Sequence, residues 1–188
     1  NIEGAMVKDW TVSEDGMTYT FNLVNNLVWS DGEPIDGWDY LFTYYAYKHA
    51  DEFESPYGYT VDDIESVSVS EDGYTVTIKF LSPSCGVLTD AAKNVVPSHV
   101  FGWTPEMGED FDWASLIGHP YETAPDVSGG PFVFSSMDPE RVVLLTVQTA
   151  SAPYVNELDR LYVHRLPKGF LRVVIRYGFM EDPDVPSA

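Results

Sequence analysis

The sequence predicts a mixed α/β (α+β) fold built from antiparallel hairpins and short helices. Three observations carry this prediction. An Asp-Gly turn separates two segments of alternating polarity, Trp10–Ser13 and Thr18–Leu23, and Asp-Gly is the strongest short hairpin signal. A similar phrase recurs at Val69–Gly73, before a second alternating segment from Tyr74 to Phe80. Between the two hairpins, apolar residues after Asp36 recur with helical spacing.

The helix is predicted from Asp36 to about Lys48. Asp36 is a favourable N-cap, and Asp39 places a second carboxylate in the first turn, where the helix dipole favours negative charge. Four residues at i, i+3, i+4 and i+7 form its apolar face: Trp38, Leu41, Phe42 and Tyr45. An aromatic stripe at this spacing is more often part of a core than a platform for a ligand.

The rest of the chain predicts loops, short helices and further strands. Residues 51–60 are expected to form a loop, 83–94 a turn with a short helix, and 102–125 mostly loop with short helical turns. Further strands are predicted at Val61–Val69, after the glycines at 129 and 130, and at Arg141–Thr149, Leu158–Leu166 and Phe170–Tyr177. The apolar run within Arg141–Thr149 indicates burial on both faces, and a proline-broken tail follows from Met180.

Composition indicates a soluble globular protein of 188 residues, of which 44% are hydrophobic and 21% charged. No stretch approaches the roughly 18 to 20 continuous apolar residues that a membrane helix needs. No signal peptide is expected within these residues, because a basic segment followed by an apolar one is missing at the start. A single cysteine, Cys85, excludes an internal disulfide.

The charge distribution divides the chain near residue 139. Residues 1–138 hold 4 basic and 24 acidic residues, whereas residues 139–188 hold 6 of each. The net charge of −20 argues against nucleic acid as a partner, because binding by counterion release needs clustered Lys and Arg. The break in charge balance indicates a change of module or of origin.

No residue pattern predicts catalysis, a cofactor or a metal site. The four histidines lack the spacing of zinc ligands: His49, His99, His119 and His164. Cys85 has no basic residue nearby in sequence, which favours a buried thiol over a nucleophile. The carboxylates could supply a glycosidase pair, but nearly all lie at turns or helix starts, where they have local roles. Aromatic residues, 14% of the chain, could line a sugar- or peptide-binding cleft or fill a large core, and the sequence leaves both open.

Two segments near the start carry a family signature. The first runs from Trp10 to Leu23 as WTVSEDGMTYTFNL, and the second runs from Val28 to Thr43 as VWSDGEPIDGWDYLFT. Further matches follow in the same order: Ser55–Tyr57, Ile64–Val67, Val96–His99 and Ser128–Phe132. Over about residues 1–137 the chain closely resembles the family 5 extracellular solute-binding proteins, which are the oligopeptide, dipeptide and nickel receptors of ABC importers. One departure is Val24, where the family often has Arg.

This resemblance implies part of a periplasmic-binding-protein type II-like lobe. Such a receptor has two lobes, closes on its ligand without chemistry and then docks on an ABC permease in the membrane. It works outside the cytoplasm, in the periplasm or anchored by lipid at the cell surface. The export signal, the anchor cysteine and most of the second lobe are expected to lie outside these residues. Tyr57 and Tyr59 match a stretch that lends a cleft-lining tyrosine in oligopeptide receptors, so they are the expected ligand-binding residues.

The C-terminal end resembles a different family. Residues 167–188, and above all the phrase RYGFMEDPDVP from Arg176 to Pro186, are similar to the cytoplasmic C-terminal domain of Kup-type potassium uptake proteins. Residues 138–166 fit both families. Because the two families place these parts on opposite sides of a membrane, we expect the chain to be a composite of two sequences.

Three functions remain open from the sequence. The first is a solute-binding component of an ABC importer, which takes a peptide or a similar small solute. The second is the soluble C-terminal domain of a Kup-type potassium transporter, supported only after about residue 138. The third is a secreted carbohydrate-active enzyme, which rests on acidity and aromatic content alone. The ligand itself is not predicted, because the first family spans peptides, metal chelates, haem and oligosaccharides.

Overall fold

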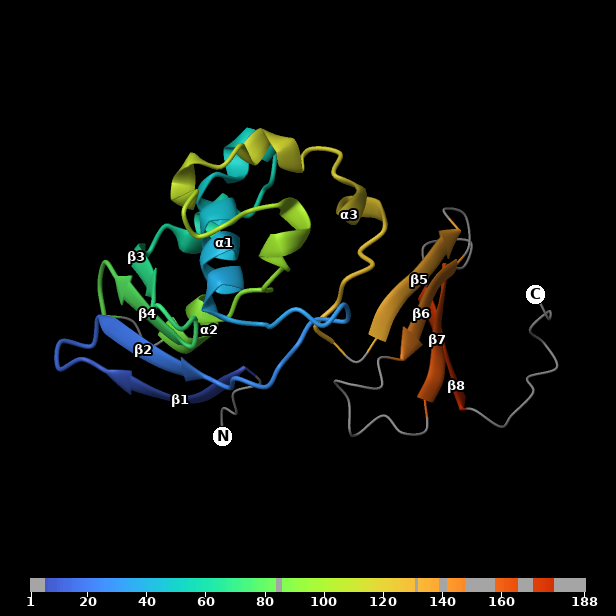
Figure 1. Ribbon diagram of the computed structural model, residues 1–188, viewed down its shortest axis with the longest axis horizontal. Coiled ribbons are helices and arrows are strands. Elements are labelled where there is room, and N and C mark those ends of the chain that lie inside the picture. The colour runs from blue at the N-terminus through green and yellow to red at the C-terminus, as the bar shows by residue number, and fades with distance from the viewer. Residues whose placement is uncertain are drawn as a thin grey trace. The chain divides into compact units, whose positions relative to one another are not determined.

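The computed structural model describes residues 6–83, 86–130, 132–138, 142–147, 158–165 and 171–177. These residues belong to two compact units. The first unit combines Asn1–Val28 with Glu33–His119, and the second combines Trp29–Gly32 with Pro120–Ala188. Figure 1 labels the helices and strands of both units.

The first unit contains a four-stranded antiparallel sheet in the order β1-β2-β4-β3. Its strands, in the order of the chain, are β1 (Val7–Val12), β2 (Thr18–Leu23), β3 (Ile64–Val69) and β4 (Thr75–Phe80). Both predicted hairpins are confirmed, and pairing of β2 with β4 joins them into one sheet, with Phe21 opposite Val76. The strand predicted from Val61 begins only at Ile64, because Val61 still belongs to a short 3₁₀ turn.

The two hairpin turns share one local design. Gly16 and Gly73 adopt φ values of 70° and 78°, which residues with a Cβ rarely tolerate. In the first turn the Asp15 carboxylate accepts a hydrogen bond from the Met17 amide at 2.9 Å. A hydrogen bond from Ser13 and this amide lower the pKa of Asp15 below its ordinary value. The repeated phrase is thus explained by turn formation.

Helix α1 (Gly37–Lys48) begins as predicted, with a capping box at its N-terminus. Asp36 accepts a hydrogen bond from the Trp38 amide at 2.8 Å, and the Asp39 side chain accepts one from the Asp36 amide. Leu41 and Phe42 are buried in the hydrophobic core of the first unit, which confirms the predicted apolar face. In Figure 1 the helix crosses the centre of the first unit, between the strands and several of the short helical turns.

Short helical turns form the remainder of the first unit. They are η1 (Ala50–Phe53), η2 (Gly58–Val61), α2 (Val87–Ala91), η3 (Ser98–Phe101), η4 (Gly108–Asp110) and η5 (Trp113–Leu116). The short helix predicted within 83–94 and the helical turns predicted within 102–125 are therefore confirmed. The loop predicted at 51–60 contains two 3₁₀ turns.

An aromatic cluster around Phe42 closes the core of this unit. Its ring centroid lies 5.3 Å from that of Phe101 and 5.6 Å from those of Trp103 and Trp113. Trp103 and Trp113 are only 3% and 1% exposed. Aromatic pairs at these separations add to the free energy of burial. The loop tryptophans at 103 and 113 therefore belong to the core. The sequence alone left open whether aromatic residues such as these line a binding cleft or fill a core.

The second unit contains α3 (Pro120–Thr123) and an antiparallel meander in the order β5-β6-β7-β8. The strands are β5 (Phe132–Asp138), β6 (Val142–Val147), β7 (Leu158–Arg165) and β8 (Leu171–Tyr177). The four strands predicted after residue 128 are confirmed to within a few residues at each end. The predicted double-sided burial of β6 and the tail after Tyr177 lie outside the described residues.

Candidate functional site

A hollow of about 460 Å³ in the first unit contains both tyrosines predicted to bind ligand, and we call it the tyrosine pocket. Its lining combines three tyrosines, one cation and two carboxylates with apolar and small polar groups. The lining residues are Tyr47, Tyr57, Tyr59, Thr60, Asp63, Ile64, Phe80, Asp90, Ala92, Lys93 and Asn94.

Tyr57 and Tyr59 are held by the 3₁₀ turn η2. The Thr60 amide and hydroxyl both donate to the Tyr57 carbonyl, at 3.0 and 2.8 Å, and these bonds fix the turn. The two tyrosines are 56% and 70% exposed. Exposed aromatic rings beside a hollow offer apolar area and a hydroxyl to a ligand at low entropic cost.

Lys93 and Tyr47 complete this pocket, although the sequence did not single them out. The Lys93 ammonium donates to the Thr60 carbonyl at 2.6 Å and lies 6.0 Å from the centre of the Tyr47 ring. Burial lowers the pKa of Lys93, and the charge of Asp90 opposes this shift. A lysine ammonium has three donors, so it can bind the Thr60 carbonyl and an anionic group of a ligand together.

The signal for Tyr47 was present in the sequence. Tyr40, Tyr44 and Tyr47 recur at i, i+4 and i+7, as a second aromatic stripe beside the predicted apolar face of the helix. Lys93 lies 46 positions after Tyr47, in the segment that follows α2, and lines the same pocket. Only the folded chain brings these two residues together.

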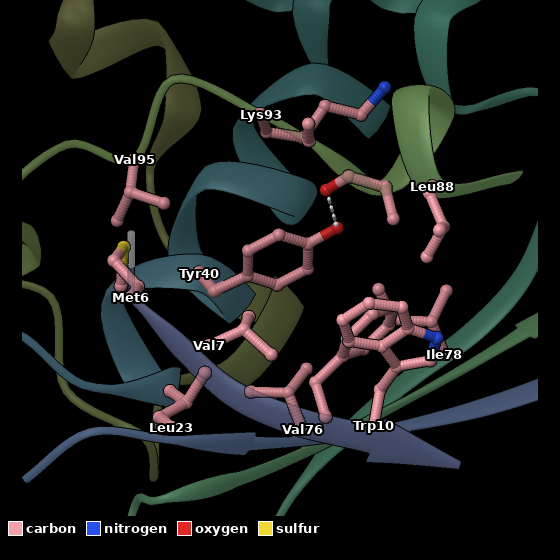
Figure 2. A pocket seen from close by; sticks show the side chains of 13 residues that line it. Met6, Val7, Trp10, Leu23, Tyr40, Val76, Ile78, Leu88, Lys93 and Val95 are labelled. Carbon is pink, nitrogen blue, oxygen red and sulfur yellow. Dashed lines mark hydrogen bonds between the residues drawn. The ribbon is translucent and has the colours of Figure 1, made fainter. Parts of the chain in front are cut away.

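A second cavity, of about 290 Å³, lies on another side of the same unit, and we call it the apolar pocket. Figure 2 shows its lining, which comes from β1, β2, β4, α1, α2 and the segment after α2. The lining residues are Met6, Val7, Trp10, Phe21, Leu23, Tyr40, Val76, Ile78, Leu88, Ala91, Ala92, Lys93 and Val95. Its walls are almost wholly apolar, which distinguishes it from the tyrosine pocket.

A polar cluster at the end of α1 has a packing role. His49 stacks on the buried Trp113 ring with centroids 5.2 Å apart, and its two nitrogens face Glu52 and Glu109. Lys48 pairs with Glu109 at 2.7 Å, a hydrogen bond that raises the pKa of Lys48. Every charged group in this cluster has a partner of opposite charge or a hydrogen bond, which agrees with a structural role.

The remaining residues weighed for chemistry are dispersed. Cys85 and the side chain of His164 lie outside the described residues. His119 packs against Phe101 with ring centroids 4.7 Å apart. Within the described ranges, no group of three or more His, Cys, Asp or Glu side chains is arranged to hold a metal ion. None of the described helices is long and apolar enough to span a membrane.

Motifs that are distant in sequence meet in space. Asp39, from the second signature segment, accepts hydrogen bonds from the amide and hydroxyl of Ser98 at 2.9 and 2.7 Å. Thr43 from the same segment accepts one from the Val96 amide at 3.1 Å. Within the second unit, the Ser30 hydroxyl accepts from the Ser128 amide at 3.0 Å. The signature residues therefore support one another structurally.

Several solved structures share this fold. The chain matches NikZ from Campylobacter jejuni in complex with Ni(L-His), with a TM-score of 0.70, 20% identity and coverage of 86% of this chain and 30% of that one. It matches the oligopeptide-binding protein AppA from Bacillus subtilis in complex with a nonapeptide, with a TM-score of 0.71, 19% identity and coverage of 89% and 32%. It also matches the periplasmic binding protein DppA from Helicobacter pylori in complex with peptide STSA, with a TM-score of 0.65 and 20% identity. This match covers 89% of this chain and 34% of DppA. The chain thus spans about a third of each of these proteins.

Sequence matches to curated proteins are shorter and concern a different group. A probable potassium transport system protein Kup 2 from Dechloromonas aromatica is 61% identical over 49 residues, which is 26% of this chain and 8% of that protein. The Kup 2 protein of Rhizorhabdus wittichii is 62% identical over 48 residues, again 26% of this chain and 8% of that protein. The chain therefore spans less than a tenth of the length of these relatives.

The family match covers far more of the chain. Residues 1–164 match the bacterial extracellular solute-binding proteins, family 5 Middle. The match contains both signature segments and runs past residue 137 into the strands β6 and β7. The fold agrees, because the solved structures named above have the same mixed α/β architecture with antiparallel sheets. The chain belongs to the bacterial extracellular solute-binding proteins of family 5.

Proposed function

We propose that this chain is part of the substrate-binding component of an ABC importer and takes up a peptide or a similar small solute. The observation that carries the proposal is the family match over residues 1–164. Family 5 solute-binding proteins act outside the cytoplasm in general, and this chain would act in the periplasm or at the cell surface. Its membrane partner would be an ABC permease.

The tyrosine pocket is the proposed ligand-contact site on the first unit. Tyr57 and Tyr59 are exposed and line the same pocket as Lys93. The rings would cover apolar side chains of a solute, and the ammonium would pair with a carboxylate, such as a peptide C-terminus. Asp63 and Asp90, which also line the pocket, would receive an ammonium group.

The proposed activity is binding without catalysis. Among the residues that the structure describes, neither cavity contains a serine or cysteine paired with a histidine. A receptor needs only a reversible fit to its solute. The solute should therefore leave the protein chemically unchanged.

The experiment is thermal denaturation of the full chain with a panel of di-, tri- and oligopeptides. A ligand at 100 times its Kd stabilises the native state by about 2.7 kcal/mol, which raises the unfolding temperature by several degrees. Tyr59→Ala and Tyr57→Ala should each reduce this shift, whereas Ile117→Ala, an equally exposed apolar residue outside the pocket, should leave it unchanged. If a peptide stabilises both tyrosine variants as much as the unsubstituted chain, the tyrosine pocket is not its binding site.

A second candidate concerns the C-terminal part and rests on the 49-residue match to Kup proteins. We propose a division into a solute-binding part at 1–137, a segment at 138–166 that fits both families and a Kup-like tail at 167–188. The change in charge balance near residue 139 supports a composite origin. Reading the encoding DNA across residues 130–170 tests this division. Two separate coding regions would support a composite, and one uninterrupted natural reading frame would contradict it.

A further inference from the structure

The apolar pocket has no role in the proposed peptide site. It lies between one face of the sheet and the helices α1 and α2, whereas the tyrosine pocket lies beside η2. The two cavities share only Ala92 and Lys93 in their linings. The chemistry of a ligand for the apolar pocket is therefore inferred from the lining of this pocket.

The Tyr40 hydroxyl is a polar group in a wall that is mostly apolar. The Tyr40 hydroxyl donates to the Ala91 carbonyl at 2.8 Å, and Figure 2 shows this bond beside the cavity. The hydroxyl hydrogen is thus occupied, while the oxygen keeps the capacity to accept a hydrogen bond. A ligand that carries a donor satisfies this acceptor.

The described part of the pocket wall presents little charge to a ligand. Lys93 is the only charged residue among the described lining residues, and its ammonium donates to the Thr60 carbonyl. In Figure 2 the nitrogen of Lys93 points away from the Tyr40 ring. An ion in this pocket would exchange part of its hydration for mostly apolar walls, which is unfavourable.

The volume and the walls of the apolar pocket further limit which ligands can bind. At the packing density of protein interiors, a cavity of about 290 Å³ holds a molecule of about ten to fifteen non-hydrogen atoms. A peptide segment brings amide donors and acceptors that these walls leave unpaired, so a peptide fits poorly. Trp10 lines the pocket and is 37% exposed, which places an aromatic ring at its edge for stacking.

We propose that the apolar pocket binds a small uncharged aromatic molecule that donates one hydrogen bond to the Tyr40 hydroxyl oxygen. The sheet side chains Phe21, Val76 and Ile78 contact the ring from one side, and Tyr40 and Leu88 contact it from the helices.

Three naphthalene derivatives test the chemistry, with binding to the full chain measured by calorimetry and by saturation-transfer NMR. 2-Naphthol supplies the ring and one donor. 2-Methoxynaphthalene keeps the ring but lacks the donor, and naphthalene-2-sulfonate carries a charge. We expect 2-naphthol to bind about fivefold more tightly than 2-methoxynaphthalene, since one hydrogen bond is lost. The sulfonate should not bind.

Two variants locate the site. Val95→Trp fills the apolar pocket without touching the tyrosine pocket, and Val12→Trp makes the same change at an exposed position of β1 outside both linings. Val95→Trp should abolish 2-naphthol binding and Val12→Trp should preserve it. Circular dichroism of both variants checks that the fold is retained. Tyr40→Phe should remove the preference for 2-naphthol while leaving 2-methoxynaphthalene binding intact.

The outcomes are distinct. Loss of 2-naphthol binding in folded Val95→Trp, together with loss of selectivity in Tyr40→Phe, supports the proposal. No saturable binding of 2-naphthol, or equal binding by Val95→Trp and Val12→Trp, overturns it. Binding of the sulfonate as tight as that of 2-naphthol also overturns it, because the pocket would then accept charge.

Discussion

The carboxylate of Asp39 accepts hydrogen bonds from both the backbone amide and the hydroxyl of Ser98, 59 residues further along the chain. Asp39 is 3% exposed and stands in the first turn of α1. Ser98 begins the short turn η3, which leads into the aromatic cluster around Phe42. One buried carboxylate thus fixes the helix start to the segment that covers the core.

Replacing Asp39 should destabilise the first unit strongly. Asp39→Ala leaves the Ser98 amide and hydroxyl buried without their acceptor, which costs about 2 to 4 kcal/mol of unfolding free energy. Urea unfolding followed by tryptophan fluorescence measures this change. Asp112→Ala is the matched control, because Asp112 is exposed and makes no side-chain cap bond. Equal stability of the two variants would contradict the role of Asp39.

Gly37 is predicted to tolerate no side chain. A Cβ at this position would lie 2.7 Å from Val76 Cγ2 and 2.8 Å from the Gly73 carbonyl oxygen. Gly37→Ala must push the helix start away from the second hairpin, at a cost of about 2 to 4 kcal/mol. The midpoint of thermal unfolding should fall accordingly.

The control for this substitution is Gly130→Ala, where the nearest atom to a new Cβ is Ser128 Oγ at 3.7 Å, an ordinary contact. We expect a change within about 0.5 kcal/mol there. A Gly37→Ala protein as stable as the unsubstituted chain would show that the helix and the hairpin are packed less closely than described.

The Ser30 hydroxyl should protect one specific amide. It accepts from the Ser128 amide at 3.0 Å and donates to the Asp126 carbonyl at 3.4 Å, within the second unit. Ser30→Ala removes both bonds at a cost of about 1 kcal/mol, so the Ser128 amide should exchange with solvent about fivefold faster. Hydrogen exchange by NMR measures this rate. Unchanged protection of Ser128 would mean that the hydroxyl bond is not formed.

Glu109 gives a prediction about pH. Burial acts to raise the pKa of Glu109, but the hydrogen bonds and charges of Lys48 and His49 outweigh it and hold the pKa below its ordinary value. A carboxyl group whose pKa is lowered in the folded state adds to the free energy of unfolding at pH values above its ordinary pKa. This contribution is lost as the pH falls through the pKa of the folded state.

Glu109→Gln should therefore be less stable than the unsubstituted chain at pH 7, by less than about 1 kcal/mol because the pair is half exposed. The difference in unfolding free energy between Glu109→Gln and the unsubstituted chain should become smaller below about pH 4. Glu71→Gln, at the exposed second hairpin turn, is the control, because none of the ion pairs between described residues involves Glu71. A constant difference between pH 3 and pH 7 would contradict the role of the ion pair.

Local structure was predictable from the sequence wherever neighbouring residues determine it. The Asp-Gly turns need glycine at positive φ, and Gly16 and Gly73 provide it. The capping box of α1 depends on Asp36 and Asp39, three residues apart. The alternating polarity of Thr18–Leu23 also predicted the strand β2.

Long-range arrangement was not predictable from these local patterns. Nothing in the two hairpins specifies that β2 pairs with β4, because this choice depends on how both cover α1. The same holds for Lys93, whose place beside Tyr47 follows from the course of the chain after α2. Tyr57 and Tyr59 were identified through the family resemblance, and their role in binding remains a prediction.

The most direct test of the account is a calorimetric titration of the full chain with the peptide that stabilises it most, followed by mass spectrometry of the recovered peptide. We expect saturable binding with one site per chain, weakened at least fivefold by Tyr59→Ala, and recovery of the peptide unchanged. Absence of binding by every peptide in the panel, or recovery of a cleaved or modified product, would contradict a solute-binding function.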